Sequence, residues 1–126
     1  PVFHQLMTMQ GIYDIASVPR AEVDAYIDLL KRDDGGRAFL AIMRGYETTA
    51  AKERLYLDTL KNRAYPAQVI WGEHDPALKI GRYGMEAQRS VGVDTIHRLP
   101  GRHFLQEDNA PAIADLVAAQ AASAAH

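Results

Sequence analysis

The sequence contains no cysteine among its 126 residues. This absence excludes disulfide bonds, thiolate nucleophiles and cysteine-based metal sites, and it agrees with a cytoplasmic location, which we take as the expectation. The chain also lacks a long uninterrupted apolar run, so we expect no membrane-spanning segment. The formal net charge is only -2. A chain with this net charge is not expected to attract nucleic acid or an anionic membrane surface by electrostatics.

The first half of the chain, residues 1–62, has the pattern of helices separated by loops. Apolar residues recur at helical spacing over residues 23–30. Tyr26 lies on this stripe, which makes it a core residue in our prediction. Two shorter stripes, over residues 39–43 and 55–60, predict two further helices.

In the second half of the chain, strands and helices alternate. Residues 68–71 form an apolar run that favours a strand, and residues 93–99 alternate in the manner of a second strand. Helices are predicted between the strands, over residues 80–91, and after them, over residues 112–122. This order predicts an α/β fold with two parallel strands. Because two strands alone are marginal in water, we expect other polypeptide to complete the sheet.

Two residues with catalytic potential follow the predicted strands. Asp75 lies in Val-Ile-Trp-Gly-Glu-His-Asp-Pro, residues 69–76, and His103 lies in Leu-Pro-Gly-Arg-His-Phe, residues 99–104. Because ligands bind at the carboxyl ends of parallel strands, the two side chains are expected at the same edge. A carboxylate that accepts a hydrogen bond from a histidine fixes the ring tautomer and leaves the other nitrogen to act as a base. Taken alone, Asp75 is equally typical of a turn that caps a helix, and His103 of a surface loop.

An acid and a histidine are two members of a nucleophile–His–acid triad, and the third member is missing from the sequence. No Gly-x-Ser-x-Gly turn occurs in the chain, and no version with Asp at the central position occurs either. Such a turn presents the attacking oxygen in many hydrolases. We therefore expect this chain alone to be inactive.

These motifs resemble a known family. Residues 71–76, Trp-Gly-Glu-His-Asp-Pro, and residues 101–108, Gly-Arg-His-Phe-Leu-Gln-Glu-Asp, followed by Pro111, resemble the C-terminal third of α/β-hydrolase-fold enzymes. The second motif is most similar to the haloalkane dehalogenase and epoxide hydrolase branch. The resemblance implies that residues 1–62 are a segment of a helical cap domain and that residues 63–126 are the C-terminal part of the hydrolase core.

The same resemblance implies roles for individual residues. Asp75 would be the triad acid and His103 the triad base, while the nucleophile, Ser or Asp, would lie on an upstream segment. Epoxide hydrolases of this branch use cap tyrosines to donate a proton to the substrate, and Tyr46 is the best placed candidate here for a substrate contact. The expected partners are a small apolar ester, epoxide, carbon–halogen or carbon–carbon substrate and the missing N-terminal half of the core. No cofactor or metal is implied.

Two other interpretations stay open. The chain could belong to a non-catalytic protein of the same fold that binds a small ligand under its cap. It could also be an independent small α/β domain that pairs with itself to complete its sheet.

Overall fold

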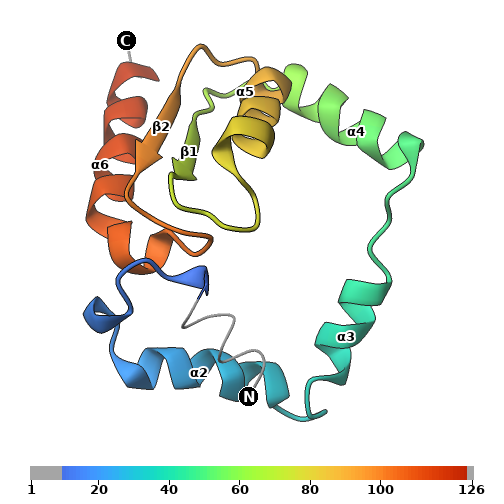
Figure 1. The fold of residues 1–126 in the computed structure, drawn as a ribbon. Coiled ribbons are helices and arrows are strands. Elements are labelled where there is room, and N and C mark those ends of the chain that lie inside the picture. Colours follow the sequence, from blue (N-terminus) through green and yellow to red (C-terminus); the bar gives the residue numbers. More distant parts are fainter. Residues whose placement is uncertain (1–9, 125–126) are drawn as a thin grey trace.

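Two short parallel strands lie side by side in the upper left of Figure 1, in the computed structural model, which describes residues 10–124. Strand β1 (Val69–Gly72) pairs with strand β2 (Ile96–Leu99). In this register Gly72 lies opposite Leu99, so both strands end at the same level. The prediction of two parallel strands in an α/β arrangement is therefore confirmed.

Helices lie on both sides of this sheet (Figure 1). A π-helical turn (Ile80–Gly84) and helix α5 (Met85–Val91) connect the two strands, and helix α6 (Gln106–Ala124) follows β2. The helix predicted over residues 112–122 begins earlier than expected, because a first turn from Gln106 runs into it across a break at Asn109. This turn lacks the apolar periodicity on which the prediction relied. The second strand is also shorter than residues 93–99 suggested.

Within residues 10–124 a short 3-10 helix (Ile15–Ser17) and three α-helices precede the sheet: α2 (Arg20–Lys31), α3 (Arg37–Arg44) and α4 (Ala50–Lys61). The Asp34 carboxylate begins α3 by accepting hydrogen bonds from three successive backbone N–H groups, those of residues 36–38. The Thr49 hydroxyl caps α4 by accepting from the backbone N–H three residues later. The predicted helices in residues 1–62 that fall within the described part of the chain are therefore present.

The largest buried apolar cluster of the described residues joins the two halves of the chain. Ile12, Val18 and Val23 are buried together, and Phe104, which follows His103, packs against them. Burial of these side chains supplies the hydrophobic free energy that holds α2 beside the start of α6. The segment before α2 is thus packed next to the loop that carries His103.

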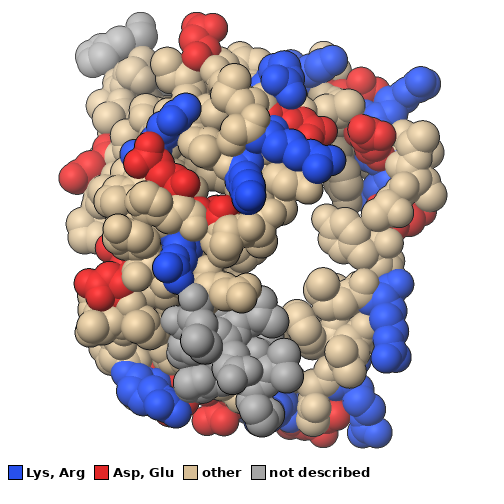
Figure 2. All heavy atoms as spheres, in the orientation of Figure 1, with Lys and Arg blue, Asp and Glu red and all other residues tan. Residues whose placement is uncertain are grey.

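The arm, which we define as residues 37–61, contrasts with this packed region. It crosses from α2 back to α5, and Figure 2 shows an opening between it and the strand region. Several large apolar side chains of the arm are exposed, namely Leu40, Ile42, Met43, Tyr46, Leu55 and Tyr56. The arm touches the rest of the described chain mainly where α4 meets α5. At that contact Arg63 donates hydrogen bonds to carbonyl oxygens at the ends of both helices, Leu60 and Val91.

Candidate functional site

The turn after β1 positions Asp75 against the loop after β2. The backbone N–H groups of Glu73 and His74 donate to the carbonyl oxygens of Leu99 and Gly101, each at 3.0 Å. This close approach requires glycine at position 72, because a Cβ atom there would lie 2.4 Å from the carbonyl oxygen of Arg102. The sheet therefore continues as a pair of hydrogen-bonded loops beyond its last regular residues.

The carboxylate of Asp75 is held by three donors. Its Oδ1 atom accepts from the backbone N–H groups of Ala77 and Leu78, both at 2.9 Å, and its Oδ2 atom lies 2.9 Å from Nδ1 of His103. The Asp75 side chain is only 6 % exposed, whereas that of His103 is 39 % exposed. The acid is thus fixed and largely dry, while the histidine ring still reaches solvent. The two residues that the sequence singled out are brought into contact.

The charge state of Asp75 follows from these contacts. Burial disfavours the carboxylate and raises its pKa, but the hydrogen bonds from Leu78, His103 and Ala77 lower it, so the net pKa lies below the ordinary value. An ionised carboxylate has only acceptors, so the shared proton must sit on Nδ1 of His103. In the neutral ring Nε2 then carries a lone pair and can accept a proton.

Nothing in the described part of the chain competes for that lone pair. Within residues 10–124, no side chain or backbone group forms a hydrogen bond with Nε2 of His103. No described Ser, Thr or second acid lies within hydrogen-bond distance of the ring either. Residues 10–124 therefore bring a carboxylate and an imidazole together, with no described Ser or Thr hydroxyl hydrogen-bonded to the ring.

A set of hydrogen bonds clamps the loop of His103 to the segment before α2. The Asp108 carboxylate accepts from the backbone N–H groups of Tyr13 and Asp14, at 3.0 and 2.9 Å. The backbone N–H of Phe104 donates to the carbonyl oxygen of Gly11 at 2.7 Å. These contacts join residues more than 90 positions apart in the sequence, so no local sequence pattern predicts them.

Two predictions about tyrosines have different outcomes. Tyr26 was expected in the core, which is wrong: the residue is 41 % exposed, and its hydroxyl donates to Glu107 at 2.6 Å. Donation to the Glu107 carboxylate raises the pKa of the Tyr26 hydroxyl. Tyr46 lies after α3 and is 71 % exposed, and within residues 10–124 no hydrogen bond or ring contact joins it to Asp75 or His103.

Another tyrosine lies closer to the pair. The Tyr13 ring stacks on the ring of His74, the neighbour of Asp75, with centroids 4.8 Å apart. Both rings line a hollow of about 640 Å³ together with Gln10, Pro76 and Arg102. Its walls therefore come from the residues that flank Asp75 and from the residue before His103. Periodicity could not reveal this role, because Tyr13 lies in an irregular segment.

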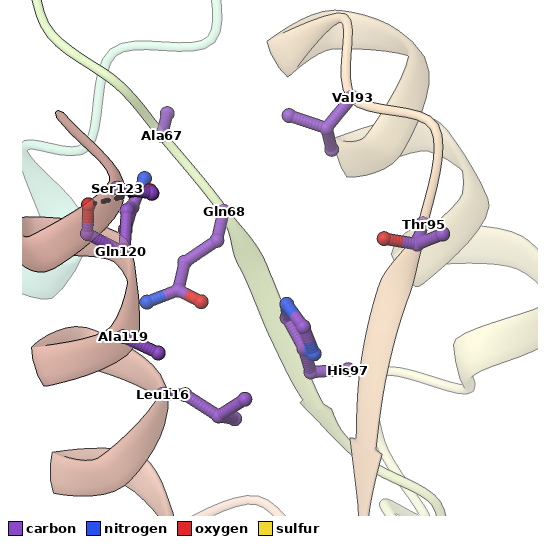
Figure 3. Close-up of a pocket in the computed structure, with 9 residues that line it drawn as sticks. All are labelled: Ala67, Gln68, Val93, Thr95, His97, Leu116, Ala119, Gln120 and Ser123. Atoms are coloured by element: carbon purple, nitrogen blue, oxygen red, sulfur yellow. Dashed lines mark hydrogen bonds between the residues drawn. The ribbon is translucent and has the colours of Figure 1, made fainter. Parts of the chain in front are cut away.

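A second hollow, of about 330 Å³, lies between α6 and the sheet (Figure 3). Several of its lining residues, among them Gln68 and Thr95, precede the strands, and His97 lies within β2. The hollow thus opens at the amino ends of the strands, opposite the end that carries Asp75. Ligands in parallel sheets bind at the carboxyl ends, which favours the edge with the acid and the histidine.

Other kinds of site find little support. The described residues contain no group of three or more His, Cys, Asp or Glu side chains placed to hold a metal ion. Over residues 10–124 no helix combines the length and apolar character that crossing a membrane requires.

No protein-family model, curated protein or solved structure matches this chain.

Proposed function

We propose that Asp75 and His103 are the acid and the base of a hydrolase of the α/β-hydrolase type. The observation that carries this proposal is the contact of 2.9 Å between Asp75 and Nδ1 of His103 at the carboxyl ends of two parallel strands. Because Nδ1 is bound to Asp75, Nε2 is the nitrogen that can react, and it belongs to a ring that is partly exposed to solvent. These are the positions that a triad requires of its acid and its base.

The chemistry follows from where the proton can go. With a serine nucleophile, Nε2 of His103 accepts the hydroxyl proton as the oxygen bonds to the substrate carbon, and then returns that proton to the leaving group. A water molecule next gives a proton to Nε2 and attacks the carbonyl carbon of the covalent intermediate. The bond from that carbon to the serine oxygen then breaks, Nε2 returns the proton to the serine oxygen, and the acid product leaves. With an aspartate nucleophile, only the second step needs His103 as a base. Throughout, Asp75 orients the ring and stabilises its protonated form.

The nucleophile belongs, in this proposal, to polypeptide outside residues 10–124, which also extends the sheet beside β1. The surface area of the chain supports such a partner. Its accessible surface is 9201 Å², whereas a folded protein of 14.0 kDa is expected to expose about 6,700 Å². This excess exceeds the area of about 800 Å² that each partner buries in a standard interface. Much of the exposed apolar surface lies on the arm, as a cap over a neighbouring core would require.

Kinetics of the assembled protein test the proposal. The protein purified with the polypeptide that completes it should hydrolyse small carboxylic esters, and His103→Ala and Asp75→Asn should each lower kcat about 10⁴-fold. His97→Ala is the matched control, because it removes a ring from β2 away from the acid and should leave kcat within a few-fold. Circular dichroism should report the same fold in all variants. A folded His103→Ala variant with undiminished turnover would refute the triad assignment.

A further inference from the structure

We propose that the hollow lined by Tyr13, His74 and Arg102 is a subsite for an anionic group of the substrate. This group is a carboxylate at the far end of the acyl group of the ester that is hydrolysed. This inference rests on the proposed function, because it names the class of substrate that the Asp75–His103 pair would act on. It moves the expected substrate from a purely apolar molecule to one that is apolar in part and negatively charged at one end.

The polar groups around the hollow are predominantly donors. Arg102 brings a guanidinium group with five N–H donors, so it can bind a carboxylate while it keeps other contacts. Gln10 adds an amide, and Tyr13 and His74 add a hydroxyl and a ring nitrogen. None of the described residues that line the hollow is acidic. An anion entering here would meet positive charge and hydrogen-bond donors, which is the chemistry that recognises carboxylates.

The acids near the hollow have hydrogen-bond or ion-pair partners of their own. Asp108 accepts from the backbone N–H groups of Tyr13 and Asp14, and Asp14 accepts from the backbone N–H of Ala16. Both oxygens of Asp75 are engaged, one by two backbone N–H groups and the other by His103, and its side chain is almost fully buried. Glu73 lies 3.9 Å from Arg98, so its charge is balanced within β2 and the turn that follows β1. Among the described residues that line the hollow, Arg102 is the one that carries a formal charge, and its five N–H donors leave room for an anion beside the contact that it already makes.

Contacts with other parts of the described chain hold two of the lining residues, Tyr13 and His74, in position. Tyr13 is stacked on His74, and its backbone N–H is fixed by Asp108. His74 is tied through its own backbone N–H to the carbonyl oxygen of Gly101. Groups that are fixed before a ligand arrives lose less entropy on binding, which favours selective recognition. The loop that positions His103 thus also positions Arg102.

A pair of isosteric esters tests the subsite in the assembled protein. Monomethyl glutarate and methyl valerate differ by a carboxylate in place of a terminal methyl group, and release of methanol reports the hydrolysis of both. We expect kcat/KM to favour monomethyl glutarate by about tenfold or more. Arg102→Gln should bring this ratio close to one, Arg102→Lys should retain part of it, and 0.5 M salt should weaken it. Arg89→Gln, which removes the same charge from the exposed side of α5, should leave the ratio unchanged.

The failure of this inference is distinguishable from the failure of the proposed function. Equal kcat/KM values for the two esters in the wild type, or an unchanged ratio in Arg102→Gln, would overturn the subsite while His103-dependent turnover persisted. If neither ester is hydrolysed, an NMR titration with monomethyl glutarate that follows the Arg102 and His74 side chains tests the subsite directly. Saturable chemical-shift changes that methyl valerate does not cause would support the subsite, and the absence of such changes would overturn it.

Discussion

The region around β1 and the arm both contain short apolar segments, but these segments are buried or half-buried around β1 and largely exposed on the arm. Val69 in β1 is buried, whereas Ile42 in α3 is 67 % exposed. In the turn after β1, backbone N–H groups and His103 hold the Asp75 carboxylate in one position, and the loop after β2 is hydrogen-bonded to the same turn. The two helices of the arm are capped by Asp34 and Thr49, and among the described residues the arm meets the rest of the chain mainly where α4 packs against α5. The comparison shows that the contact between Asp75 and His103 forms within the described chain, whereas several large apolar side chains of the arm stay exposed. This difference agrees with our proposal that a partner covers the arm.

The largest effect is expected where the two loops meet. Gly72→Ala would place a Cβ atom against the carbonyl oxygens of Gly101 and Arg102, which cannot move without shifting His103. We expect it to lower the free energy of unfolding by about 3 kcal/mol. Gly81→Ala is the control, because a Cβ atom there meets nothing within 4 Å. Urea unfolding measures both, and equal stabilities would mean that the loops are not tightly joined.

The pH dependence of stability tests the charge on Asp75. Because its pKa is lowered in the folded chain, the contribution of Asp75 is fully present above its ordinary pKa of about 3.9 and is lost as the pH falls through the lower, folded value. Asp75→Asn should lower the free energy of unfolding by about 1–3 kcal/mol at pH 7. The difference from wild type should shrink at the lowest pH. A constant difference over the whole range would contradict the ionised pair.

Asp108 is expected to have a smaller effect. Asp108→Ala leaves the backbone N–H groups of Tyr13 and Asp14 without their acceptor, at a cost of about 1 kcal/mol because the site is exposed. Hydrogen exchange of these two amides should accelerate in the variant. Asp115→Ala, on the exposed face of the same helix, should leave both amides protected as in the wild type. Identical exchange in both variants would show that the clamp does not hold this segment.

The arm should respond least. Ile42→Ser should change the free energy of unfolding of the isolated chain by less than about 0.5 kcal/mol, since the side chain is already in water. Val23→Ala removes part of a side chain that is 2 % exposed and should cost about 2 kcal/mol. In the assembled protein Ile42→Ser should become costly. A large loss in the isolated chain would mean that the arm is packed against this chain after all.

The sequence predicted what depends on local pattern and on strand order. The parallel strands and the meeting of Asp75 with His103 followed from two short apolar runs and the residues directly after them. The clamp made by Asp108 and the stacking of Tyr13 on His74 could not be predicted, because they join segments far apart in sequence. Tyr26 was misassigned because an apolar stripe indicates which face of a helix is buried, but not how deeply each residue along it is covered.

Peptide mass spectrometry after a rapidly quenched single turnover tests the central claim most directly. With monomethyl glutarate and a serine nucleophile, we expect a glutaryl ester on a Ser outside residues 10–124, formed as methanol leaves in the wild type, and no adduct in His103→Ala. An aspartate nucleophile would form an ester by opening an epoxide, so a small epoxide is the second probe, and with it the adduct should accumulate without hydrolysis in His103→Ala. Product formation without any adduct, or with an adduct that forms and decays equally fast in His103→Ala, would contradict the assignment of Asp75 and His103 as the acid and the base.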